Sequence, residues 1–123
     1  MLMLSSPRDP VTFSLMQYFK DYREHFGTSA TKFFKTALFD SPRLLVGLNC
    51  LEPGQAQPQH AHHGQDKVYL VLEGQGTFTV GHERRVAGEG TVVWAPATVE
   101  HGVENTGDAS LVLLVGIAPA AEG

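Results

Sequence analysis

From Lys32 onward the chain consists of short runs rich in Val, Leu, Phe and Thr, which glycine and proline interrupt at intervals. Runs of this kind, spaced by roughly 8–12 residues, are typical of an all-β sandwich or barrel. With 123 residues there is room for one such domain with a real core. We predict strands over residues 32–39, 43–51, 67–73, 76–80, 83–86, 91–95, 100–104 and 110–117.

The N-terminal part shows a different pattern. After a proline-containing arm over residues 1–12, apolar side chains recur at helical spacing, with Ser14 suited to begin a helix and Gly27 to end it. These side chains are Leu15, Tyr18, Phe19, Tyr22 and Phe26. The predicted organisation is an N-terminal arm with a short helix over 1–31, a β-barrel domain over 32–118 and a tail over 119–123.

Charge and composition exclude several functions. Residues 51–123 carry nine acidic against three basic residues, so this half would repel phosphate backbones, and we expect no nucleic-acid partner. No apolar run approaches the ~20 residues of a membrane span, and we expect a soluble, cytoplasmic protein with no membrane partner. The single cysteine, Cys50, allows no internal disulfide and falls in an alternating apolar run, which favours a buried position.

Two histidines separated by one residue stand just before an apolar run. Residues i and i+2 of an extended chain point to the same face, so His60 and His62 aim at one point, as two metal ligands would. A third candidate ligand, His101, follows 41 residues after His60. Three imidazoles with open coordination positions suit a divalent transition metal, namely Zn, Fe, Mn, Ni or Cu.

The spacing around these histidines resembles that of the cupin family. The first cupin motif, Gly-x5-His-x-His-x3–4-Glu-x6-Gly, and the second, Gly-x5-Pro-x-Gly-x2-His-x3-Asn, share eight of ten positions with this chain. The matching residues are Gly54, His60, His62, Gly74, Gly90, Pro96, His101 and Asn105. The resemblance implies a small single-domain, antiparallel jelly-roll β-barrel with the histidines in one mouth, and often a homodimer.

Lys67 occupies the motif's Glu position, and Thr98 occupies a Gly position. An ammonium ~5 Å from a divalent ion would cost about 6 kcal/mol at an effective dielectric constant of about 20. We therefore expect Lys67 to turn toward Asp66 or Glu73 and to leave the ion with three histidines plus water or substrate. His63 and Gln65 remain alternative candidates for the missing ligand. Tyr69 is also near the site, because it shares the strand face of Lys67.

Three classes of function stay open. A metal on three neutral ligands keeps its full positive charge and favours a small, anionic molecule in its open positions. The protein could transform such a molecule, as a metal-dependent dioxygenase or isomerase, or bind it without chemistry; alternatively, the site is degenerate and the protein structural.

Independently, the outward side chains of Val68, Leu70 and Leu72 form surplus apolar surface, from which we predict a homodimer.

Overall fold

A computed structural model of the chain describes residues 17–120 and shows an all-β protein. One short 3-10 turn precedes the strands, and every strand pairing among the described residues is antiparallel. The elements are η1 (Tyr22–Glu24), β1 (Phe34–Asp40), β2 (Leu45–Leu51), β3 (Ala56–His60), β4 (Asp66–Glu73), β5 (Gln75–Val80), β6 (Glu83–Gly88), β7 (Val92–Ala95), β8 (His101–Glu104) and β9 (Leu111–Ala118).

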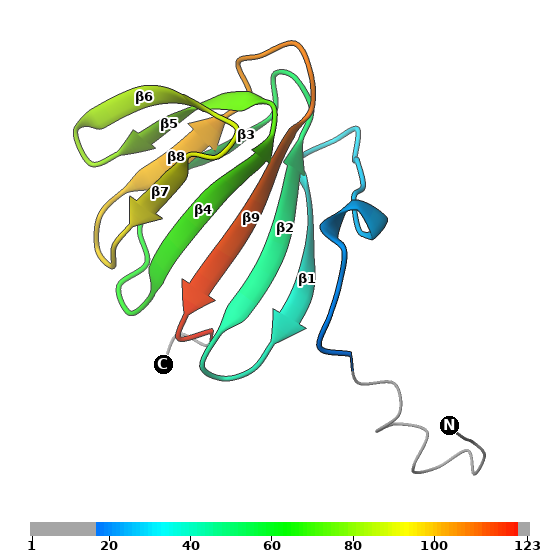
Figure 1. Cartoon of the computed structure of the whole chain (residues 1–123). Helices are drawn as coiled ribbons and strands as arrows, with labels where there is room; N and C mark the ends of the chain where they lie inside the picture. The colour runs from blue at the N-terminus through cyan, green and yellow to red at the C-terminus, as the bar shows by residue number, and fades with distance from the viewer. Residues whose placement is uncertain (1–16, 121–123) are drawn as a thin grey trace, which may run out of the picture.

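The strands form two sheets that face each other as a jelly-roll barrel (Figure 1). The larger sheet has the order β1-β2-β9-β4-β7, and the smaller has the order β3-β8-β5-β6. Consecutive strands therefore alternate between sheets in several places, which brings the two histidine-bearing segments, β3 and β8, side by side. No helix among the described residues is long and apolar enough to cross a membrane.

All eight predicted strands are present within a few residues of their predicted ends, and the structure adds β3. The alternation in β4 is also as predicted: Lys67, Tyr69 and Val71 are buried, while the intervening side chains are more exposed. Sequence reasoning missed β3 because its residues, Ala-Gln-Pro-Gln-His, are poor strand formers. Proline is tolerated there because β3 is an edge strand, with β8 as its neighbour in the sheet.

The predicted N-terminal helix is wrong over the described residues. Its one regular element is the 3-10 turn η1, capped by Asp21, whose carboxylate accepts a hydrogen bond from the backbone N–H of Arg23 (3.0 Å). Tyr18 and Phe19 are 76% and 91% exposed, so the apolar period does not form one buried stripe. A short amphipathic segment needs a packed face to be stable as a helix. Ser14, Leu15 and the arm lie outside the described residues.

The main core fills the space between the sheets. It consists of inward side chains from both layers, with Tyr69 and Phe78 in edge-to-face contact at a centroid distance of 5.5 Å. The buried residues are Leu51, Tyr69, Val71, Phe78, Ala87, Ala95, Val103, Leu111, Leu113 and Val115. This core supports the inward row of β4, and therefore sets where Lys67 and Tyr69 lie.

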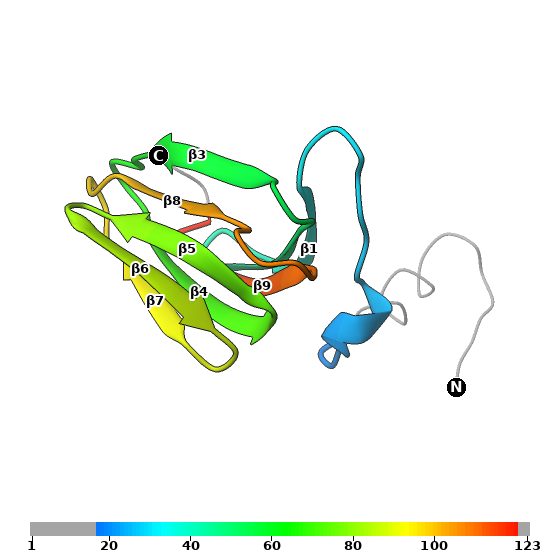
Figure 2. The same ribbon diagram turned by 90° about the horizontal axis from the view of Figure 1, so that it is seen from above.

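A second apolar cluster lies on the outer face of the larger sheet. Leu38, Leu48, Cys50 and Val112 are buried there, and Tyr22 of the N-terminal segment packs against them. The Tyr22 hydroxyl donates to a carboxylate oxygen of Glu73 (2.8 Å), which ties the segment to the end of β4. Figure 2 shows this segment on the outside of the barrel, beside β1. Cys50 is buried, as the sequence indicated.

Asn105, the last residue of the second motif, stabilises the fold. Its side chain is 1% exposed, and its Nδ2 donates to the carbonyl oxygens of Leu51 (2.7 Å) and Ala109 (2.9 Å). Its Oδ1 accepts a hydrogen bond from the backbone N–H of Gly107 (2.9 Å). One carboxamide thus satisfies backbone groups at the end of β2 and in the loop between β8 and β9. A buried backbone group of this kind would cost about 1–3 kcal/mol if left unpaired.

Candidate metal centre

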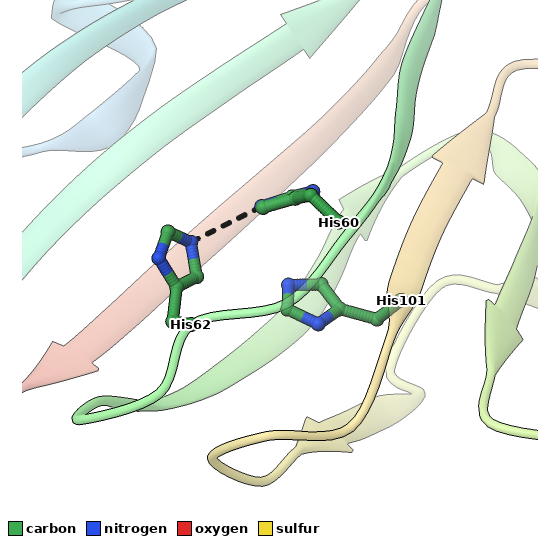
Figure 3. A group of neighbouring side chains, drawn as sticks. All are labelled: His60, His62 and His101. Atoms are coloured by element: carbon green, nitrogen blue, oxygen red, sulfur yellow. Dashed lines mark hydrogen bonds between the residues drawn. The ribbon is translucent and has the colours of Figure 1, made fainter.

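Two neighbouring strands of the smaller sheet position the three histidines. His60 ends β3, His101 begins β8, and the two residues are directly opposite in the register of the pair. His62 follows β3 in the connection to β4 and points back toward the same place (Figure 3). The ring centroid of His60 lies 4.8 Å from that of His62 and 4.5 Å from that of His101. The structure therefore brings together all three residues that the spacing indicated.

A bulge in β3 makes this register possible. The pairing with β8 shifts between Gln57 and His60, where β3 comes close to Gly102. A Cβ atom on Gly102 would lie 2.9 Å from the carbonyl oxygen of Gln57 and 3.0 Å from the backbone nitrogen of Gln59. Any other residue after His101 would push β3 away. The glycine thus allows His60 to lie beside His101.

Backbone carbonyls fix which ring nitrogen faces the centre. His60 Nδ1 lies 2.9 Å from the carbonyl oxygen of Pro58, and His101 Nδ1 lies 3.0 Å from that of Val99. A carbonyl can only accept, so both Nδ1 atoms carry the proton and both Nε2 atoms present a lone pair. Metal-binding histidines in proteins are commonly oriented by this second hydrogen bond.

His101 Nε2 has no hydrogen-bond partner among the described residues, although it is buried. The residue is 2% exposed, and burial lowers the pKa of its imidazole, with the nearby His60, Lys67 and His62 acting in the same direction. The ring is therefore neutral near pH 7, the state that a metal ligand requires. A buried lone pair without a partner is costly in a folded protein, and a bound cation would satisfy it.

The donor atoms of the three histidines lie within 4.8 Å of one another, and His60 Nε2 and His62 Nε2 are 3.1 Å apart. Metal–nitrogen bonds of about 2.0–2.1 Å place two ligands of one ion roughly 3–3.5 Å apart. The pair on the β3 side already has this separation as a hydrogen bond, whose shared proton a metal ion would displace, and ligation would draw His101 closer. The residues therefore fit a divalent ion, which would supply a Lewis-acidic centre with open positions for a ligand oxygen.

The expected position of Lys67 is wrong. Its side chain does not reach Asp66 or Glu73, whose carboxylates accept hydrogen bonds from the Ala97 N–H (2.9 Å) and the Tyr22 hydroxyl (2.8 Å). Instead Lys67 follows the inward row of β4, is 5% exposed, and holds its Nζ 4.9 Å from the centroid of the Tyr69 ring. The pleat of β4 decides the direction, and the aromatic face offsets part of the desolvation cost.

Burial, reinforced by Lys35, lowers the pKa of Lys67 to about 8. The ammonium form still predominates at pH 7, so the position where the motif has a carboxylate carries a positive charge. A cation inside the barrel disfavours a metal ion at the same end through repulsion, and favours an anion.

The other candidates near the site have different surroundings. Gln65 is buried, and its Nε2 donates to the carbonyl oxygens of Pro119 (3.1 Å) and Ala120 (2.9 Å), so it fastens the chain after β9. His63 is exposed and outside the group of three histidines. Tyr69 lies against the site, with its ring centroid 6.3 Å from that of His101, and burial raises the pKa of its hydroxyl.

A cavity of about 270 Å³ opens along the inner faces of β1, β2, β9 and β4, with Lys67 in its wall. Lys35, Asn49 and Gln57 also line it, and sequence reasoning had not singled them out. Asn49 could have been noticed, because it is a polar residue within the apolar run Leu48-Asn49-Cys50-Leu51 of a buried strand. Gln57 and Lys35 gave no such signal, since strand pairing across the fold brings them to the cavity.

The fold and the site together define a class: jelly-roll β-barrel proteins with a group of three histidines that could hold a metal ion. The profile of the cupin domain matches residues 47–117, which include all three histidines. The chain belongs to the cupin family.

Similar proteins support this assignment. An uncharacterised protein of Streptomyces coelicolor is 39% identical over 70 residues, and the match covers 57% of this chain and 66% of that protein. A solved structure from Thermus thermophilus is 40% identical, with a TM-score of 0.81 over 84% of this chain and 98% of that one. An oxalate-binding protein of Thermotoga maritima is 30% identical over 80 residues, 65% of each chain. The chain thus spans about two thirds or less of these curated relatives.

Proposed function

We propose that the protein binds a small carboxylate through a divalent transition metal held by His60, His62 and His101. The observation that carries this proposal is the buried Nε2 of His101, which has no partner among the described residues and belongs to an imidazole grouped with those of His60 and His62. Three neutral ligands leave the ion its full charge, and carboxylate oxygens are the natural partners for its open positions.

The relatives favour the same class of ligand. The Thermotoga maritima protein is named an oxalate-binding protein, and a solved structure from that organism, 30% identical with a TM-score of 0.59 over 60% of this chain, is described as a predicted oxalate decarboxylase. Both similarities cover only part of each chain, so they support a carboxylate rather than oxalate in particular.

The test is calorimetric titration of untagged protein with oxalate and with acetate, before and after removal of metal by EDTA and reloading with Mn²⁺ or Zn²⁺. We expect about one equivalent of metal, carboxylate binding to the loaded protein, and binding at least tenfold weaker after EDTA treatment. Equal binding before and after metal removal would contradict the proposal. Incubating the loaded samples with oxalate and measuring its consumption distinguishes an enzyme from a binding protein.

We further propose that the protein is a homodimer. On the outer face of the larger sheet, β4 and β7 pair Val68 with Trp94 and Leu70 with Val92. Val68, Val92 and Trp94 are 40%, 64% and 65% exposed, because the N-terminal segment covers the other side of this face. An apolar patch on an antiparallel sheet is readily buried by a second copy related by a two-fold axis.

Light scattering at micromolar concentration should give twice the chain mass of 13.4 kDa, and Trp94→Glu should reduce it to that of a monomer, because a buried carboxylate would have no partner. Leu44→Glu provides a control, since Leu44 is 48% exposed but lies in the turn between β1 and β2. A wild-type mass near 13.4 kDa that does not rise with concentration would exclude the dimer.

A further inference from the structure

Lys67 has no partner for its charge among residues 17–120. The residue is 5% exposed, and within that range no carboxylate or hydrogen-bond acceptor contacts its Nζ, whose one polar neighbour is the face of the Tyr69 ring. Buried ammonium groups in folded proteins are normally paired, because the isolated charge is expensive to desolvate. A lysine in this position therefore points to a ligand that supplies the negative charge.

The cavity beside Lys67 has a partly apolar wall, but its polar groups suit an anion. Its wall contains a second cation, Lys35, and two carboxamides, Asn49 and Gln57, but no acidic residue from the part of the chain that the structure describes. Lys35 is near enough to lower the pKa of Lys67, so the two cations repel each other across the cavity. An anion between them would relieve both the desolvation of Lys67 and this repulsion.

Two amides add hydrogen-bond donors. The Tyr69 hydroxyl donates to Oε1 of Gln57 (2.7 Å), which leaves the Nε2 protons of Gln57 for another acceptor. Asn49 is 6% exposed, and its carboxamide makes no hydrogen bond with the described residues. Because Asn49 lines the cavity, a bound molecule could accept a hydrogen bond from its Nδ2. Ammonium and amide N–H groups that line one cavity are suited to the two oxygens of a carboxylate.

The cavity and the histidine centre are neighbours. Tyr69 is close to both, with its ring centroid 4.9 Å from Lys67 Nζ and 6.3 Å from the His101 centroid. The sum of these two distances is the upper limit of the separation between the ammonium and that imidazole. One small molecule can span it.

We propose that the ligand is a small dicarboxylate that places one carboxylate at the three-histidine metal centre and the other in the cavity between Lys67 and Lys35. This inference rests on the proposed metal function and adds the second anchoring point. It also gives Lys67 a role at the position where the cupin motif has a glutamate. The glutamate would bind the metal ion, whereas Lys67 pairs its positive charge with the second carboxylate of the bound molecule.

The experiment compares succinate with butyrate, a monocarboxylate of similar length, by calorimetry on metal-loaded protein. We expect succinate to bind at least tenfold more tightly, and Lys67→Met to remove this preference while metal binding is retained. Methionine is an unbranched side chain, one atom shorter than lysine and without its charge, so we expect the melting temperature of this variant to equal or exceed that of the wild type. Lys32→Met, at an exposed position outside the cavity, should keep the preference.

The outcomes separate the two proposals. If no metal binds to the wild type, the three-histidine centre is wrong, and the dicarboxylate proposal is wrong with it. If metal binds but succinate and butyrate have equal affinities, or if folded Lys67→Met keeps the preference, only the assignment of the cavity is overturned.

Discussion

Replacing His101 by alanine is expected to abolish metal binding. His101 supplies the most buried of the three imidazoles, already neutral and held by Val99 with its Nε2 toward the centre. Loss of residues that only orient a ligand typically costs 10–100-fold in metal affinity, so loss of the ligand itself should cost about a hundredfold or more. Calorimetric titration with Zn²⁺ would measure the metal affinity, and metal analysis after dialysis would measure the stoichiometry.

His82→Ala is the matched control. His82 is exposed in the turn between β5 and β6 and belongs to no group of candidate ligands among the described residues. It should retain full stoichiometry. If His101→Ala also keeps one equivalent of metal with unchanged affinity, the ion is held elsewhere and the three-histidine centre has to be abandoned.

A Lys67→Glu variant is expected to bind the metal ion at least tenfold more tightly than the wild type, a gain of about 1.4 kcal/mol. The side chain lies in the inward row of β4, so the substitution replaces a buried positive charge with a carboxylate at the position where the cupin motif has one. Repulsion of the ion is removed and attraction is added. The same calorimetric titration measures the change.

Lys32→Glu changes the net charge by the same amount at an exposed position and should leave the metal affinity nearly unchanged. An unchanged affinity in Lys67→Glu as well would show that residue 67 does not influence the ion, despite lying against Tyr69. Such a result would also speak against the proposal that Lys67 pairs with a bound carboxylate at the position where the cupin motif has a metal-binding glutamate.

The fold and the grouping of the three histidines could be predicted because both depend on sequence patterns. Alternating apolar residues predicted the β4 face that carries Tyr69, and the i, i+2 spacing predicted that His60 and His62 converge. The motif positions then added His101, whose partnership with His60 is a matter of register across two strands. Patterns of this kind survive folding because one buried face imposes them.

The errors lie where tertiary contacts outweigh the local pattern. The aromatic period near Tyr18 and Phe19 suggested a helix, but these two side chains are exposed. The segment is instead held on the barrel by contacts of single residues, among them the packing of Tyr22 and a hydrogen bond from Lys20 Nζ to the carbonyl oxygen of Leu38 (2.8 Å). Lys67 was expected to turn toward Asp66 or Glu73 because an ammonium close to a divalent ion is costly, yet the pleat of β4 directs its side chain inward. The cavity could not be predicted, because Lys35, Asn49 and Gln57 come from three strands that only the folded chain assembles.

The irregular edge strand β3 gives the metal centre a mechanical meaning. β3 has a single sheet neighbour among the described strands, β8, and its ladder is interrupted between Gln57 and His60 and contains Pro58, which has no N–H to donate. An ion bound by both His60 and His101 would cross-link β3 to β8, where the hydrogen-bond ladder between the strands is weak. Metal binding and the integrity of the barrel edge would then be thermodynamically linked: an ion bound only by the folded chain would add to the free energy of unfolding, and the edge would fray first when the ion leaves.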